Sequence, residues 1–394
     1  MLPLADIKIL DFTRVLAGPY STMVLADLGA DVLKIEMPGT GDDARAFGPF
    51  IGKESAYFMS INRNKRSMTL NLKLGDGKKI AQELVKRADV VVENFRPGTM
   101  EKLGLGYEDL KKLNPNIIYA ACSGFGHSGP HMTKPAYDAI VQAMGGIMSL
   151  TGQEGGEPTR IGASIGDITA GIFTAVGIIS ALYCRKKTGI GQKVDVAMLD
   201  CQVAILENAI ARYFVSGEIP KPIGNRHPSV TPFDTFDTTN GKIMVSIGND
   251  RLWAQFCTLV GREELIKDER FVTNGARTEN HDQIRPIVRE ILKDQSTEYW
   301  LEIFDKSNIP ATEINPIDKV VSHPQILARD MIVSIKHPKV NEFKMAGIPI
   351  KLSETPGKIR KAPPTLGEHT EEVLAGILNY SVEEIANLRE TGVI

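Results

Sequence analysis

A single carboxylate stands among small residues near the middle of the chain. Asp167 follows residues 162–166 (GASIG) and precedes an apolar stretch that predicts a helix. The small residues leave room for a bulky ligand, and the start of a helix supplies backbone N–H donors and a dipole that favours an anion. Such a carboxylate is suited to act as a nucleophile that forms a covalent intermediate. The position is also typical of a helix N-cap, and one residue can serve both roles.

The segment 11–36 has the outline of a dinucleotide-binding unit. It contains a strand, a turn with Gly18, a helix and a second strand that ends at Glu36, where an acidic side chain would hold a ribose. The G-x-G-x-x-G signature is missing, because the turn reads TRVLAGPYSTM with one glycine before the helix. NAD binding is therefore disfavoured, and an NAD-dependent oxidoreductase stays only as an alternative.

Several basic residues are candidates for binding an anionic ligand. Some follow predicted strands, where open α/β sheets bind ligands, although each taken singly is as easily a solvated surface charge. The run Asn94-Phe95-Arg96 is more informative, since an amide, an aromatic ring and a cation end a strand together, although it could also be a structural turn. The basic candidates are Arg14, Lys34, Arg45, Arg63, Lys65, Arg66, Lys73, Arg96 and Lys102.

The histidines and cysteines show no spacing typical of a metal site. His127 and His227 lie in Gly-rich loops, and the zinc-binding pattern H-E-x-x-H does not occur. The four cysteines are far apart, without a C-x-x-C pair, and are expected to be reduced thiols. We therefore expect no metal and no tightly bound redox cofactor.

The elements that must position these residues alternate between strand and helix. This alternation favours an open, doubly wound and largely parallel α/β sheet of the Rossmann-like type. Residues 220–325 differ, because a Pro- and Gly-rich segment leads into a hairpin with its turn at Asn240-Gly241, which predicts a smaller α+β lobe. Strands are predicted at residues 7–12, 31–36, 67–72, 89–93, 117–123 and 347–352, and helices at residues 18–28, 75–88, 107–113, 252–260, 277–293, 298–307 and 382–390.

The totals agree with a two-lobed globular protein. A chain of 394 residues exceeds what one hydrophobic core usually organises. The net charge of -2 gives no field that would gather nucleic acid or an anionic membrane. Acidic residues interrupt the N-terminus where a signal peptide would be apolar, so a cytoplasmic location is expected. The uncharged run 168–184 is shorter than the ~20 residues of a bilayer span and predicts a buried helix.

With these residues in hand, the chain resembles the class III CoA-transferases, a family that includes formyl-CoA transferase, carnitine CoA-transferase and 2-methylacyl-CoA racemase. The matching stretches span nearly the whole chain: LDFTRVLAGPYSTMVLADLGADVLKIE, INRNKRSMTLNLK, ADVVVENFRPGTMEKLGL, GFGHSGP, the pair Gly166-Asp167, KTGIGQKVDVAMLD and LGEHTEEVL. The resemblance implies a large CoA-binding α/β domain that begins with residues 1–219, a small domain at 220–325, and a return segment, 326–394, that completes the large domain. It also implies an interlocked homodimer.

The resemblance further implies an enzyme that moves coenzyme A, as a substrate, from an acyl-CoA to a small carboxylic acid. Asp167 falls on the catalytic aspartate of the family. Lys102 replaces an arginine, and Met37 stands where some members stack an arginine on adenine. Residues 224–227 replace a glycine-rich loop that closes over the acyl-aspartate, so the substrate is expected to differ from oxalate and formate. The implied coenzyme contacts are Val15, Leu16, Ala17, Met37, Leu70, Lys73, Asn94, Phe95, Arg96, Lys102, Ala136 and Tyr137, and the implied substrate loop is Gly224, Asn225, Arg226 and His227.

One difference favours transfer over racemisation. Racemases of this family carry a histidine proton carrier at the position that Tyr137 occupies here. An unperturbed phenol, with a pKa near ~10, is a poor proton acceptor at neutral pH. A racemase or epimerase would need Tyr137 or His127 in that role, and a non-catalytic CoA-binding protein is a further alternative. A second carboxylate on the substrate would need a cation such as Arg14, Arg45 or Arg226.

Overall fold

A computed structural model describes residues 1–394, and its centre is a six-stranded sheet in which every pairing is parallel. The strand order is β5-β2-β1-β6-β7-β8, so the chain moves outward on one side of β1 and then returns to start the other side at β6. The prediction of an open, doubly wound sheet is confirmed. The switch point between β1 and β6 is where such sheets bind ligands. The strands are β1 (Lys8–Asp11), β2 (Asp31–Glu36), β5 (Lys65–Thr69), β6 (Val90–Glu93), β7 (Ile118–Ser123) and β8 (Lys193–Ala197).

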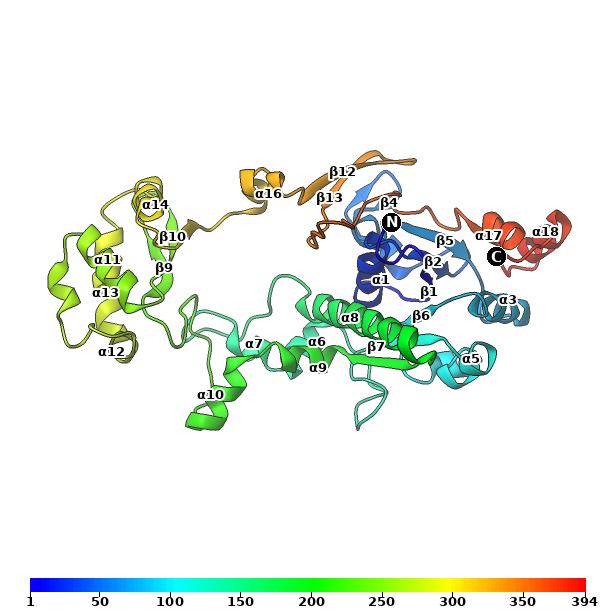
Figure 1. Cartoon of the computed structure of the whole chain (residues 1–394), viewed down its shortest axis with the longest axis horizontal. Coiled ribbons are helices and arrows are strands. Elements are labelled where there is room, and N and C mark those ends of the chain that lie inside the picture. Colours follow the sequence, from blue (N-terminus) through cyan, green and yellow to red (C-terminus); the bar gives the residue numbers. More distant parts are fainter. The chain divides into compact units, whose positions relative to one another are not determined.

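Helices cover both faces of this sheet because successive strand residues point to opposite sides. In β1, Ile9 packs into a cluster with α1 and α8, whereas Leu10 packs into a cluster with α3, α5, α17 and α18. The C-terminal helices, red in Figure 1, return beside β5 and α3, so the first and last parts of the chain share one core. The covering helices are α1 (Ala17–Asp27), α3 (Gly75–Val85), α5 (Tyr107–Leu113), α8 (Ile165–Thr188), α17 (Thr370–Gly376) and α18 (Val382–Glu390).

The long helix α8 crosses α1 at close range. A Cβ atom on Gly171 would lie 2.7 Å from the carbonyl oxygen of Ala17, so only glycine permits this approach. By length and composition alone, α8 is the one helix apolar enough to span a membrane, and 44% of its apolar window is buried in the protein. The expected buried helix is therefore buried along one face, while apolar side chains on the opposite face remain exposed: Ile172, Phe173, Val176, Ile179 and Tyr183.

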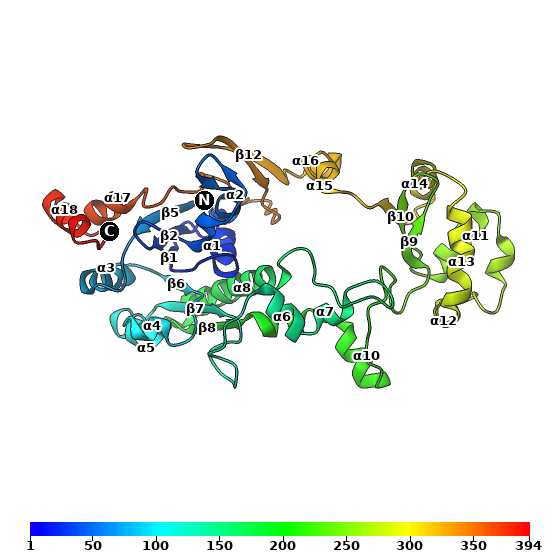
Figure 2. The same cartoon turned by 180° about the vertical axis from the view of Figure 1, so that it is seen from behind.

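The chain divides into two compact units, the first made of Met1–Ile147, Arg160–Val215 and Gln325–Ile394, and the second of Met148–Thr159 and Ser216–Pro324. In the second unit, β11, β10 and β9 form an antiparallel sheet whose β9–β10 hairpin turns at the expected Asn240-Gly241. Helices pack beside this sheet around Trp253, Phe256 and Trp300 (Figure 2). These elements are β9 (Phe233–Asp237), β10 (Lys242–Ser246), β11 (Ala311–Glu313), α11 (Asp250–Leu259), η2 (Glu263–Ile266), α12 (Asn274–Glu279), α13 (His281–Leu292), α14 (Thr297–Lys306) and α15 (Ile317–Val320).

The return segment corrects one sequence prediction. The strand expected at residues 347–352 is absent, and the antiparallel pair β12–β13 lies just before it. The helix expected at residues 382–390 is confirmed as α18, where Ser381 and Glu384 form a capping box. The remaining elements are α2 (Ala56–Ile61), α4 (Thr99–Lys102), α6 (Asp138–Met144), α7 (Ile147–Leu150), α9 (Met198–Ala204), α10 (Asn208–Ser216), α16 (Pro324–Ala328), η1 (Asp43–Ala46), β3 (Phe50–Ile51), β4 (Glu54–Ser55), β12 (Ile332–His337) and β13 (Asn341–Ala346).

Candidate active site

Asp167 lies inside the first turn of α8 and does not cap it. The N-cap position belongs to Ser164, and no side chain caps this helix end. The N-cap interpretation of Asp167 is therefore wrong. Two N–H groups of the turn are already engaged, since Ile165 donates to the carbonyl of Ala163 and Gly166 donates to Asp138. The Asp167 carboxylate itself forms no side-chain hydrogen bond or ion pair, so it remains available to a ligand.

Asp138, at the start of α6, fixes the segment that leads into α8. Its Oδ1 accepts the Gly166 N–H at 2.8 Å, and its Oδ2 accepts from Gln142 at 2.7 Å. Gln142 in turn accepts the N–H of Ile161 at 2.9 Å. A Cβ atom on Gly166 would lie 3.0 Å from Asp138 Oδ1 and 2.7 Å from Val141, which explains the glycine. Sequence reasoning missed Asp138, although an acidic residue directly after Tyr137 at the start of a helix was a visible signal.

The Asp167 carboxyl has an unusual affinity for its proton. Burial, and secondarily the nearby negative charge of Asp138, raises the pKa of Asp167 to about 7. The helix dipole was expected to keep this group ionised, but here burial and the second carboxylate outweigh it. A strongly perturbed group in a cleft is typical of a functional site.

Asp167 lines a cavity of about 230 Å³ at the switch point of the sheet, called the Asp167 cavity below. Its wall comes from the segments after β1, β6 and β7 and from the starts of α1, α6 and α8. Most of the implied coenzyme contacts line this cavity together with Asp167, the implied catalytic residue. The sequence-predicted residues that line it are Val15, Leu16, Ala17, Asn94, Phe95, Arg96, Ala136, Tyr137 and Asp167.

A second cavity of about 470 Å³ adjoins the first and is called the Met37 cavity. It is lined by all but one of the remaining implied coenzyme contacts, namely Met37, Leu70 and Lys73. The two cavities share three lining residues, Arg14, Asp43 and Phe95. The exception is Lys102, which is exposed on α4 and lines neither cavity, so its role at the coenzyme stays a prediction.

Five of the basic candidates are largely buried and are committed to ion pairs within the protein. They are neither solvated surface charges nor free anion binders. Arg45, for example, holds Glu36 with two bonds of 2.7 Å and lies over the Phe58 ring. Breaking a buried pair would leave an uncompensated charge, which is costly. The pairs are Lys34–Asp42, Arg45–Glu36, Arg63–Asp27, Lys65–Asp11 and Arg66–Asp31.

His127 is engaged away from the Asp167 cavity. Its Nδ1 lies 2.9 Å from Lys193 Nζ, and its Nε2 lies 3.5 Å from Glu93. Burial, together with Lys193, lowers the pKa of His127. Burial also raises the pKa of Glu93 to about 7, although Glu93 accepts the N–H of Phe95 and so holds the turn after β6. His127 is therefore not placed to act as the proton acceptor that a racemase needs, or as a second nucleophile.

Cys122 is the thiol closest to the chemistry, since it lines the Asp167 cavity. Burial raises the pKa of Cys122 to about 12, so the group is a neutral thiol at physiological pH. All four cysteines are free, as expected. A neutral thiol is a poor nucleophile, so Cys122 is not suited to covalent catalysis here.

The predicted substrate loop belongs to the second unit. Gly224 has a φ of +66° and donates its N–H to the carbonyl of Gly152. Asn225 donates to Thr235 at 3.0 Å, and the His227 ring stacks on Phe233. The Nε of Arg226 is buried without a hydrogen-bond partner. The loop is thus held by its own unit, and its closure over substrate stays a prediction.

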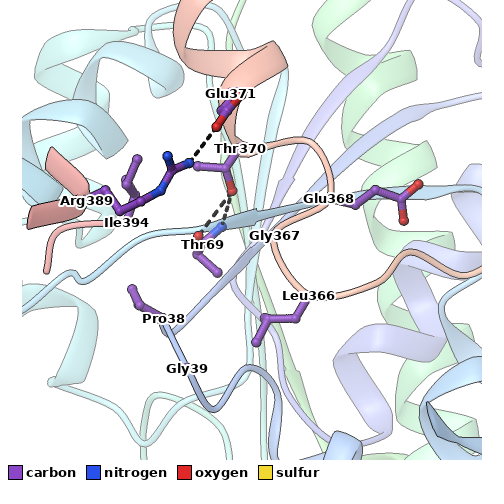
Figure 3. A pocket seen from close by; sticks show the side chains of 10 residues that line it. All are labelled: Pro38, Gly39, Thr69, Leu366, Gly367, Glu368, Thr370, Glu371, Arg389 and Ile394. Carbon is purple, nitrogen blue, oxygen red and sulfur yellow. Dashed lines mark hydrogen bonds and ion pairs between the residues drawn. The ribbon is translucent and has the colours of Figure 1, made fainter. Parts of the chain in front are cut away.

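A third cavity, of about 490 Å³, lies near the C-terminus and contains none of the predicted site residues. Figure 3 shows that Arg389, its one cation, is turned toward Glu371, with which it forms an ion pair. Thr370 closes another side through hydrogen bonds to Thr69. Its lining offers no unpaired nucleophile, so volume alone does not identify the active site.

Comparisons with known proteins agree with this geometry. The profile of CoA-transferase family III matches residues 4–370. The succinyl-CoA:glutarate CoA-transferase of Homo sapiens is 39% identical over 393 residues, covering 100% of this chain and 90% of that protein. The acetyl-CoA:oxalate CoA-transferase of Acetobacter aceti is 43% identical over 352 residues, covering 89% of each chain. Among solved structures, a CaiB/BaiF family protein from Brucella suis has a TM-score of 0.84 and 39% identity, covering 95% of this chain and 99% of that one.

Proposed function

From the premise that the chain belongs to CoA-transferase family III, and so transfers coenzyme A between acyl-CoAs and carboxylic acids, we propose that Asp167 is the covalent carrier. One observation supports this most strongly. An unbonded carboxylate with a raised pKa lines a cavity at the switch point of the sheet, and a larger cavity adjoins it. This arrangement can present a thioester to the nucleophile while the rest of the coenzyme is held nearby.

The proposed exchange has two forward steps and their reversal. The Asp167 carboxylate attacks the thioester carbonyl, the C–S bond breaks, and a mixed anhydride and a CoA thiolate form. The thiolate then attacks the aspartyl carbonyl, which releases the first acid as its carboxylate and leaves an aspartyl-CoA thioester. The acceptor carboxylate attacks this thioester to give a new anhydride, and the thiolate attacks the acceptor carbonyl. The products are the new acyl-CoA and a free Asp167 carboxylate.

The protein must hold the thiolate close during this sequence, because water also attacks an anhydride. Binding of the rest of the coenzyme supplies a high effective concentration of the thiolate at the aspartyl carbonyl. Each step also develops an oxyanion, which backbone N–H donors stabilise. The start of α1 is the proposed source, since Leu16 and Ala17 line the cavity and no side chain caps this helix.

The acceptor is proposed to be a dicarboxylic acid. The similar enzymes named above are described as acting on glutarate and oxalate, with succinyl-CoA or acetyl-CoA as donors. Arg45 cannot hold the distal carboxylate because it is committed to Glu36. Arg226 belongs to the second unit, and its role at the distal carboxylate stays a prediction.

A crossed assay tests the proposed activity. Succinyl-CoA and acetyl-CoA are each offered with oxalate, glutarate, and their monocarboxylate counterparts acetate and valerate, and new acyl-CoAs are detected by mass spectrometry. We expect at least one dicarboxylate to accept coenzyme A at least about a hundredfold faster than its counterpart, since a site that pairs with a second carboxylate is left unpaired by the analogue. Preference for the monocarboxylates would contradict the substrate class, and no transfer at all would contradict the activity.

Racemisation is the second candidate within the family. It requires a proton acceptor at the α-carbon, and Tyr137 is the side chain at the relevant position in the Asp167 cavity. His127 does not line that cavity and is engaged with Lys193. Deuterium exchange into the α-carbon of 2-methylacyl-CoA without an acceptor acid distinguishes the two activities. Membership of the family sets aside an NAD-dependent oxidoreductase and a non-catalytic protein.

We also propose that the enzyme is an interlocked homodimer. The helix α10 has no buried residue, and Tyr213, Phe214 and Val215 are 47%, 79% and 89% exposed. The outer face of α8 adds Phe173 and Val176. Large exposed apolar side chains on two helices are typical of an interface between subunits.

Sedimentation tests the dimer. The unmodified chain is expected to sediment as a dimer at micromolar concentration. Val215→Glu should shift it toward monomer or insoluble protein, because the substitution places a charge in the proposed interface. Val382→Glu is the matched control, since Val382 is 80% exposed at the isolated start of α18. A monomeric wild type would contradict the proposal.

A further inference from the structure

The Asp167 cavity and the Met37 cavity meet at Arg14, Asp43 and Phe95. Ligand sites usually occupy about 300–1,000 Å³, a range that the Met37 cavity reaches and the Asp167 cavity alone does not. A ligand as long as coenzyme A, with its thioester at Asp167, must extend from one cavity into the other. Whatever part of the ligand lies at the junction therefore lies beside Arg14.

The backbone of Arg14 is held rigidly on both sides. Asn94 accepts its N–H at 2.8 Å and donates to its carbonyl at 2.7 Å. The next residue, Val15, has a φ of +66°, which is unusual for a β-branched residue, and Asp42 holds its N–H at 2.9 Å. Strained backbone that the surroundings maintain tends to occur at functional sites.

The side chain of Arg14, by contrast, is loosely held. Its Nη1 lies 3.2 Å from Asp43, and the two side chains are 49% and 54% exposed. The guanidinium carbon lies 5.0 Å from the centre of the Phe95 ring. An exposed ion pair contributes little to stability, so Arg14 can exchange Asp43 for another anion at small cost.

No other cation occupies this place. Lys73 lines only the Met37 cavity, and Arg96 and Lys134 line only the Asp167 cavity. Arg14 is thus the one basic residue that both cavities share. Its planar guanidinium can bind phosphate oxygens through two parallel hydrogen bonds, which suits a diphosphate.

We propose that Arg14 binds the diphosphate of coenzyme A at the junction of the two cavities, releasing Asp43 and remaining stacked on Phe95. This inference rests on the proposed function, because the ligand is coenzyme A. The Arg14–Asp43 pair keeps the guanidinium oriented before the coenzyme arrives. Asp43 competes for Arg14 and repels phosphate, so the two side chains have opposite effects on coenzyme affinity.

Calorimetric binding of CoA and of dephospho-CoA tests the proposal without requiring turnover. CoA carries no acyl group, and dephospho-CoA keeps the diphosphate but lacks the 3′-phosphate. Arg14→Gln is expected to weaken the binding of both ligands by the same factor, about tenfold or more. Asp43→Asn is expected to strengthen both. Arg389→Gln, which alters the arginine of the C-terminal cavity in Figure 3, is the control and should change neither.

Each other outcome overturns the proposal. A loss confined to CoA would assign Arg14 to the 3′-phosphate, and unchanged affinity for both ligands would leave Arg14 to the acyl carboxylate or to neither. Weaker binding by Asp43→Asn would show that the pair acts structurally. A wild type that bound no CoA would instead contradict the proposed function, so the two failures are distinguishable.

Discussion

Replacing Asp167 with asparagine is expected to reduce kcat for CoA transfer by at least about a thousandfold while leaving the affinity for coenzyme A nearly unchanged. The amide is close in size to the carboxylate but cannot form the anhydride. The contacts proposed for the coenzyme lie elsewhere in the two cavities, so binding persists. Steady-state rates and calorimetry on the same preparation separate these two effects.

Two further variants make this result specific. Asp167→Ala should be as inactive as the asparagine variant, which excludes a role in which the amide substitutes for a hydrogen bond. Asp200→Asn alters an exposed carboxylate on α9 that does not line the Asp167 cavity, and it should retain full activity. An asparagine variant at position 167 with wild-type turnover would remove the covalent mechanism.

The rate is expected to fall in acid with the titration of Asp167. The nucleophile is the carboxylate, and its pKa is raised to about 7, chiefly by burial. Below that value the ionised fraction, and with it kcat, should decrease about tenfold for each pH unit. Initial rates at saturating substrate between about pH 5 and 8 measure this acid limb of the pH–rate profile. A flat profile would contradict the prediction.

Asp138 is expected to affect the pH at which the rate falls in acid. Its negative charge disfavours a second negative charge on Asp167, so Asp138→Asn lowers the pKa of Asp167 and moves the acid limb to lower pH. The asparagine oxygen can still accept the N–H of Gly166, although the bond from Gln142 is lost. A purely structural role would lower the rate at every pH without moving the limb. A limb that moved to higher pH would contradict the assigned cause.

Much of the large sheet could be predicted from the sequence because its signals are local. Strands such as residues 117–123 are short, mostly apolar runs, and glycine or proline marks where several of the neighbouring helices begin or end. The C-terminal part was harder. The segment 347–352, which reads GIPIKL, was predicted as a strand, yet the strands formed at Ile332–His337 and Asn341–Ala346, where pairing across a tight turn decides the structure.

The site shows the same division. Asp167 could be found because its small neighbours are adjacent in sequence. The relation of Asp167 to Asp138 could not be predicted, because it depends on a hydrogen bond from the Gly166 N–H to Asp138, two residues that are 28 positions apart. The buried ion pairs of Lys34 and Lys65 likewise could not be predicted, because only the fold brings their acidic partners near them. The left-handed backbone at Val15 has no local signal, since it is maintained by Asp42 and the neighbouring bonds of Asn94.

The most direct test of the account is chemical trapping of the enzyme during turnover. The enzyme is mixed with an acyl-CoA and quenched with hydroxylamine or borohydride, and its peptides are analysed by mass spectrometry. A hydroxamate, or a reduced side chain, is expected at Asp167 only when acyl-CoA is present. An enzyme that transfers coenzyme A while its Asp167 peptide is never modified would contradict the central claim.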